Sequence, residues 1–220
     1  MHGHAREECE FLAPVMVGER LQSRSLIVDR YLKREREYVV NETLLFNAAG
    51  RLVTRLRVHQ SFLMQKPADG EQRLAVDRSR ERAANRVFPV GERGGEPIAA
   101  PMRPVTQAMC IAFSGPSRNY HTDRDAAREL GFPEIVVQGM LSVCMLAGMM
   151  TARFGMGFLA GGRMDVRLVN VLWCGESTGP RGLIVERRPE GRRHRAQVEV
   201  WCEKADGTKT VVGSASAVEP

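Results

Sequence analysis

The chain has 220 residues, of which 43% are hydrophobic and 26% charged, a composition typical of a globular protein with a sizeable core. Its formal charge of +6 rests almost wholly on arginine, which suits a phosphate-bearing ligand, a nucleic acid or a plain solvated surface equally. The five cysteines form no CxxC pair and the first residues carry no secretory signal, which argues against a zinc site, a disulfide framework and export, and favours the cytoplasm.

The first part of the chain, residues 14–64, is predicted to be β-structure. Apolar runs or alternating patterns cover residues 26–28, 38–46 and 52–62, and a turn at 47–50 joins the last two as a hairpin. Residues 65–103 then change in character. Their arginines, glycines and prolines are typical of an exposed connector.

The second part of the chain is predicted to contain both helices and strands. Residues 105–113 are apolar and are predicted as a strand, followed by a loop over 114–120 and a short helix over 123–130, which Gly131 ends. From residue 163 to the end the pattern is β again, with hairpins at 189–191 and 205–207.

Between these segments lies an apolar stretch, residues 139–154, that predicts a helix about 24 Å long. It is apolar all the way round, so we expect it to be covered on every side. Extended back to Ile135, it approaches the length of a membrane span, but Gln138 and the glycines in and beside it argue against that reading. A helix wrapped by a sheet is the better interpretation.

The two β-rich parts are related by an internal repeat. Leu26-Ile27-Val28 corresponds to Leu183-Ile184-Val185, and the turn glycines Gly50 and Gly207 correspond at the same offset of 157 residues. The alternative is chance similarity between basic hairpins, but an ungapped period of this length favours a duplicated domain. We therefore expect a partial first copy over 1–66, a connector over 67–103, and a complete second copy over 104–220.

The repeat has a consequence for the first copy. The helix at 139–154 has no counterpart within the sequence, because the offset would place it before Met1. A first copy with strands only would expose an apolar trough, which an acyl tail, the connector or another subunit could fill. We expect chemistry in the second copy only.

The loop before the apolar helix carries the chemistry. Residues 112–123 read AFSGPSRNYHTD, and Ala126-Ala127, Gly131-Phe132 and VVQGML at 136–141 follow. This pattern resembles the MaoC-like dehydratase and (R)-specific enoyl-CoA hydratase family, whose signature is F-S-G-D-x-N-P-x-H-x-D, then an alanine, G-F and V-x-x-G-M/L. The resemblance implies an α+β hot-dog fold, here a double hot dog whose antiparallel sheet wraps one long central helix, with the first copy lacking its helix.

The resemblance also implies a hydratase or dehydratase that acts on an α,β-unsaturated or 3-hydroxy acyl thioester. His121 would be the acid–base group, the Gly139 N–H would hold the thioester oxygen, and Asn119 would bind the carbonyl or the water. The further predicted substrate-binding residues are Ser117, Arg118, Gln138 and Met140. The family's aspartate is Pro116 here, so the usual two-group mechanism cannot operate.

Each of these residues also has a structural reading. His121 could be a loop histidine, Gly139 a helix start, Arg118 a solvated cation, and the methionines of residues 140–150 core filling rather than the lining of an acyl tunnel. Asp123 and Asp125 are interpreted as charges at a helix start.

Two other functions stay open at this point. One is a non-catalytic acyl-CoA-binding protein or partner subunit of a hydratase, and the other is a hot-dog thioesterase whose carboxylate would be Glu129 or Glu134. We expect an acyl-CoA or acyl carrier protein thioester as ligand, no cofactor, no metal, no nucleic acid, no membrane, and a homodimer or higher oligomer.

Overall fold

The computed structural model describes residues 2–33, 36–63 and 85–219. Its strands are β1 (His2–Phe11), β2 (Gln22–Lys33), β3 (Arg36–Phe46), β4 (Leu52–Leu63), β5 (Glu96–Ala99), β6 (Arg103–Pro104), β7 (Arg163–Leu168), β8 (Ser177–Glu190), β9 (Arg193–Lys204) and β10 (Lys209–Val218). Its helices are α2 (Gln107–Ser114), α3 (Arg124–Glu129), α4 (Gly139–Phe154) and α5 (Met156–Leu159).

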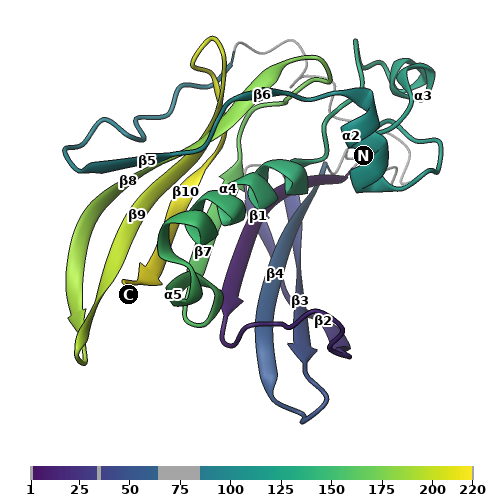
Figure 1. Ribbon diagram of the computed structural model, residues 1–220. Helices are drawn as coiled ribbons and strands as arrows, with labels where there is room; N and C mark the ends of the chain where they lie inside the picture. The colour runs from purple at the N-terminus through teal and green to yellow at the C-terminus, as the bar shows by residue number, and fades with distance from the viewer. Residues whose placement is uncertain (1, 34–35, 64–84, 220) are drawn as a thin grey trace.

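The ten strands of the described chain form one antiparallel sheet in the order β2-β3-β4-β1-β7-β10-β9-β8-β5, with β6 beside β8. The next four strands in this order, β7, β10, β9 and β8, are the second-copy counterparts of β1, β4, β3 and β2. The two copies therefore mirror each other across the pair β1–β7, which we call the seam. Figure 1 shows α4 lying across the second group of strands, while β2, β3 and β4 extend beyond it. The sheet therefore wraps one long helix, as predicted.

The internal repeat is confirmed strand by strand. Strand β3 begins at residue 36 and β9 at residue 193, and β4 begins at 52 and β10 at 209, each pair 157 residues apart. The bulges repeat as well. Val28 is the extra residue in β2 and Val185 in β8, and Val53 is the extra residue in β4 and Thr210 in β10. Since bulges set the local bend of a strand, both halves of the sheet curve at the same places.

Helix α4 has the predicted bounds, but it is not covered on every side. Val143, Leu146 and Met150 point into the main core, whereas Cys144 and Gly148 are exposed. No atom lies within 4 Å of the position that a side-chain carbon on Gly148 would take. The sheet covers only the face that carries the large side chains, and a stripe of small residues is left open.

The main core lies between α4 and the second copy. Its buried members include Val143, Leu146, Met150, Phe154, Val166, Val198, Val200 and Val211. The first copy contributes Cys9, with Phe11 and Leu56 packed against the cluster. Among residues 2–33 and 36–63 there is no helix, as expected.

The trough of the first copy is less apolar than predicted. The register pairs Cys9 with Leu56 and Leu56 with Thr43, so these three side chains share the face that meets the core. Two residues along each strand, the same face carries Glu7, Val58 and Asn41. The trough is a mixed surface with a carboxylate in it.

Three further expectations are corrected. Residues 107–114 form helix α2 instead of a strand, because the Thr106 side chain caps the helix start and Gly115, at φ 85°, ends it. Strand β1 lies before residue 14, where the predicted β-structure of the first part begins. Of the expected connector 67–103, residues 67–84 lie outside the described part of the chain. Its residues 96–99 form β5, an edge strand paired with β8.

None of the described helices is both long and apolar enough to cross a membrane.

Candidate active site

The loop between α2 and α3 is held by its own side chains. The Thr122 hydroxyl donates to the Ser117 carbonyl oxygen at 2.7 Å and accepts from the Asn119 N–H at 3.1 Å. The Asn119 Oδ1 accepts from the His121 N–H at 2.8 Å, and its amide nitrogen donates to the Ser117 carbonyl at 3.0 Å. These local turns shape the loop and set the direction in which His121 leaves it.

The imidazole of His121 is tied to the segment that leads into α4. Its Nδ1 lies 2.7 Å from the carbonyl oxygen of Val136, three residues before Gly139. The Val136 N–H in turn donates to the Tyr120 carbonyl at 3.1 Å, and the Tyr120 ring lies against the imidazole with centroids 3.9 Å apart. Because a carbonyl only accepts, Nδ1 carries the hydrogen, and the lone pair of the neutral ring is on Nε2.

Helix α4 begins at Gly139 with its first amides pointing out of the helix. Gln138 is the N-cap, and its side chain makes no capping hydrogen bond. A side-chain carbon on Gly139 would lie 1.8 Å from a methyl carbon of Leu168, at the end of β7. An alanine here would therefore force the end of the Leu168 side chain to move. The first turn holds no acidic residue, so the positive end of the helix dipole is not neutralised within it.

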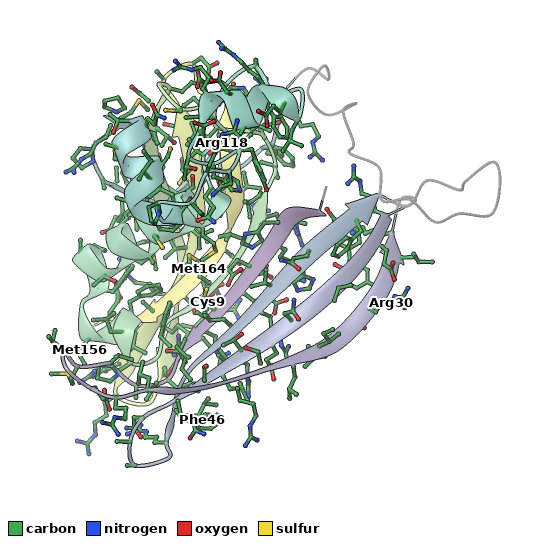
Figure 2. All side chains as sticks on the ribbon, turned by 90° about the vertical axis from the view of Figure 1, so that its right-hand side faces the viewer. Cys9, Arg30, Phe46, Arg118, Met156 and Met164 are labelled. Carbon is green, nitrogen blue, oxygen red and sulfur yellow. The ribbon has the colours of Figure 1, made fainter. Side chains whose placement is uncertain are left out.

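The other predicted site residues do not all gather there. Arg118 forms hydrogen bonds with both oxygens of Glu129, at 2.6 and 3.3 Å, and lies 3.3 Å from Asp123. Its guanidinium lowers the pKa of the Glu129 carboxyl through these bonds. Figure 2 shows Arg118 in the helical part of the second copy, well away from Arg30 at the outer edge of the first. Met140 packs against the main core.

Asp123 is confirmed as a helix-start residue. Its carboxylate caps α3 by accepting from the Ala126 N–H at 2.8 Å, and Asp125 lies in the first turn. Arg124 pairs with Glu134 at 2.9 Å and lowers the pKa of that carboxyl. Glu129 and Glu134, the two carboxylates considered for a thioesterase, are both bound to arginines.

An imidazole–carboxylate pair on β1 is not predicted by the sequence pattern, in which His4 belongs to no metal-ligand spacing. His4 and Glu7 lie 2.9 Å apart, Nε2 to Oε2, on β1. In a regular strand, residues three apart face opposite ways, so alternation could not have predicted this contact. An irregularity between His4 and Arg6 brings it about.

The outer face of the sheet has a hollow of about 410 Å³ at the seam between the two copies. None of the predicted site residues lines it. Its arginines are matched by carboxylates, as in the pairs of Arg55 with Glu10 at 2.9 Å and Arg163 with Glu10 at 3.3 Å. Within the described ranges, no cluster of three or more histidine, cysteine or acidic residues could hold a metal ion.

Comparison with known families now decides the assignment. Residues 90–213, more than half of the chain, match the family model of the MaoC like domain. The chain belongs to the MaoC-like domain family. No curated protein matches the chain.

Solved structures support the same fold. A MaoC-like dehydratase superposes with a TM-score of 0.75 at 19% identity, covering 100% of this chain and 76% of that one. A MaoC-like dehydratase from Phytophthora capsici gives 0.70 at 18%, covering 99% and 69%. A conserved hypothetical protein from Mycobacterium tuberculosis with a double hot-dog fold gives 0.60 at 12%, covering 98% and 74%. This MaoC-like chain is a double hot dog whose described first copy lacks the helix.

Proposed function

We propose that this MaoC-like protein is a hydratase or dehydratase that acts on an enoyl or 3-hydroxyacyl thioester of coenzyme A or acyl carrier protein. The observation that carries the proposal is the juxtaposition of the His121 imidazole with the start of α4, through the 2.7 Å contact between Nδ1 and the Val136 oxygen. An acid–base group and a set of helix-start amides are what addition of water to such a thioester requires.

The chemistry follows from charge. Water adds to the β-carbon while the electron pair of the double bond moves toward the thioester carbonyl, whose oxygen becomes negative. The Gly139 N–H, at the positive end of α4, stabilises that oxygen. Such a donor lowers the activation barrier by about 2.7–4 kcal/mol. His121 Nε2 takes one proton from the water and returns it to the α-carbon, so that the net change is the addition of one water molecule.

Smaller roles belong to the same proposal. Asn119 and Ser117 hold the loop and lie beside His121, so either can bind the water, while Gln138 and Met140 flank Gly139 and would contact the acyl group. Arg118 is bound to Glu129, so a phosphate would have to compete for it. Cytoplasmic location, the domain limits given above and an oligomer also stay parts of the proposal.

The test is hydration of a panel of enoyl-CoA thioesters, followed by loss of enoyl absorbance with the thioester intact. His121→Ala should lower kcat/KM by roughly 100-fold or more, since positioned proton transfer contributes that much. The exposed His194 on β9 is the matched control, and His194→Ala should retain the wild-type rate. A loss of less than tenfold for His121→Ala, about 1.4 kcal/mol, would remove His121 from this role.

Two other functions would give different products. Pro116 favours a partner subunit without activity of its own, which would be stabilised thermally by acyl-CoA but would turn it over only with a second protein. A thioesterase would release free thiol. The pairing of Glu129 and Glu134 with arginines disfavours that reaction, because neither carboxylate is left for a water at the helix start.

A further inference from the structure

The strand β1 carries an irregularity that turns two functional side chains to one face. His4 pairs with Gln60 and Glu7 pairs with Val58 on β4, and Ala5 is the extra residue between them. Since Val58 and Gln60 are two residues apart on β4, their partners His4 and Glu7 lie on the same face. Bulges of this kind re-aim side chains and occur beside active sites.

Within this pair the carboxylate is the buried member and the imidazole is the accessible one. The Glu7 side chain is 1% exposed and that of His4 is 20% exposed. Glu7 Oε2 binds His4 Nε2 at 2.9 Å, while Oε1 is buried with no hydrogen-bond partner in the described chain. A buried, half-satisfied carboxylate is expensive, so its retention calls for an explanation.

The contact also sets the tautomer of His4. Where the Glu7 carboxylate accepts this hydrogen bond, Nε2 carries the hydrogen and the lone pair is on Nδ1. A carboxylate behind an imidazole fixes the ring and makes it a better acceptor at its far nitrogen. Glu7 thus does for His4 what the Val136 carbonyl does for His121.

The register of the seam brings this pair to the start of α4. Arg6 on β1 pairs with Arg167 on β7, and the next residue of β7 is Leu168. Leu168 is the side chain that packs against Gly139. The irregularity beside His4 on β1 therefore lies next to Leu168 on β7, and neighbouring strands are about 4.8 Å apart. Leu168 in turn contacts Gly139, the first residue of the helix.

Electrostatics also link Glu7 to the first half of α4. Burial, and then the nearby Glu7 carboxylate, raise the pKa of the Cys144 thiol on α4. Cys144 is five residues after Gly139, about 7.5 Å along the helix axis. Cys144 also lies on the exposed stripe of α4 that includes Gly148. The titratable groups near Glu7 are therefore His4, which it binds, Cys9 on its own strand, and Cys144 on α4.

We propose that His4, from the first copy, is a second catalytic residue of the same site and that Glu7 is its positioning residue. The pair would take the place of the family's aspartate, whose position is Pro116 in this chain. The inference rests on the proposed function. The attacking water donates one hydrogen to His4 Nδ1 and the other to His121 Nε2, which leaves an oxygen lone pair directed at the β-carbon. His121 takes its proton and returns it to the α-carbon, and the new hydroxyl still donates to His4.

Turnover of crotonyl-CoA tests the role of His4. His4→Gln should lower kcat by roughly 100-fold with little change in KM, since loss of a water-positioning group affects the reacting geometry rather than thioester binding. The matched control is the other imidazole–carboxylate pair of the same sheet, His59 and Glu8 at 2.8 Å, which faces the opposite side. Glu8→Gln should leave kcat within about twofold of wild type.

The ¹⁵N signals of the His4 ring, read in the full chain, test Glu7. In wild type they should show hydrogen on Nε2. Glu7→Leu should release the ring to a tautomer mixture and lower kcat, whereas Glu7→Gln, which keeps an acceptor, should retain more of both. Butyryl-CoA, which cannot be hydrated, should perturb the same signals in wild type.

The outcomes separate the two proposals. Turnover that needs His121 but not His4, with no effect of butyryl-CoA on the His4 ring, overturns the role of His4 and leaves the hydratase standing. An absence of turnover with the His4 signals still perturbed overturns both the hydratase and the catalytic role of His4. Release of free thiol that depends on Glu7 also overturns both, because it would make Glu7 a base in hydrolysis.

Discussion

At the scale of single residues, the site is built from backbone atoms as much as from side chains. The Val136 carbonyl sets the tautomer of His121, the Asn119 side chain sets the path of the loop, and the Gly139 amide faces outward from α4. A motif search finds the residue types but not these contacts. The juxtaposition of His121 with the start of α4 could be predicted because His121 and Gly139 belong to one local pattern in the sequence. The contact of His4 with Glu7 could not, because it depends on one extra residue in a strand.

Gly139 offers the sharpest residue-scale prediction. Gly139→Ala would place a side-chain carbon 1.8 Å from a Leu168 methyl, a flexible chain end that can move, so we expect a loss of stability of about 1 kcal/mol, at the low end for overpacking. Urea unfolding measures the change. In the double variant with Leu168→Ala the clash is removed, so the two effects should combine to less than their sum. Gly148→Ala, at an open position of the same helix, is the control and should be neutral or slightly stabilising. Additive losses would show that the contact with Leu168 is not the cause of the loss.

At the scale of elements, short helices are fixed by their caps. The two helices on either side of the His121 loop have side-chain N-caps, Thr106 for α2 and Asp123 for α3. The sequence supported α3 through Asp123 and Gly131, but the apolar run at 105–113 was equally compatible with a strand. Apolar runs of that length do not distinguish the two, and the cap that decides the case is a single threonine.

Removal of the α3 cap should loosen both the helix and the loop. Asp123→Ala leaves the Ala126 N–H without its acceptor at 2.8 Å, and we expect a loss of about 1 kcal/mol in urea unfolding. Asp123→Asn is the matched control, since asparagine caps nearly as well, and it should stay within about 0.5 kcal/mol of wild type. If both variants lost the same amount, the ion pair with Arg118 rather than the cap would be the stabilising contact.

At the scale of the whole molecule, duplication explains most of what the sequence allowed. The offset of 157 residues predicted strands and turns in both copies, and the structure extends it to the bulges. What the repeat alone could not reveal is the seam: β1 and β7 are counterparts at the same offset, but nothing in their residues indicates that the two copies pair with each other. The same pairing brings the first copy to the second copy's helix. Figure 2 shows Cys9 and Met164, a pair in that register, at the junction of the two groups of strands.

The seam is held by an aromatic contact that can be tested. Phe11 on β1 lies against the buried Phe158 of α5, with ring centroids 4.9 Å apart, and its N–H donates to the Gly162 carbonyl at 2.9 Å. Phe11→Ala should lower the free energy of unfolding by about 2 kcal/mol, less than for a fully buried ring because Phe11 is only half-buried.

A double-mutant cycle shows whether that loss belongs to the joint between the copies. Combined with Phe158→Leu, Phe11→Ala should show a coupling of about 0.5–1.5 kcal/mol, the value of an aromatic pair beyond its buried area. Phe46→Ala, at the end of β3 and two strands from β1 in the sheet, should show none with Phe158→Leu; Phe46 is labelled in Figure 2. Equal coupling for Phe11 and Phe46 would mean that Phe158 senses the stability of the first copy as a whole. Coupling for Phe11 alone would place the joint at β1 and α5, the strand that also carries His4 and the helix that directly follows α4.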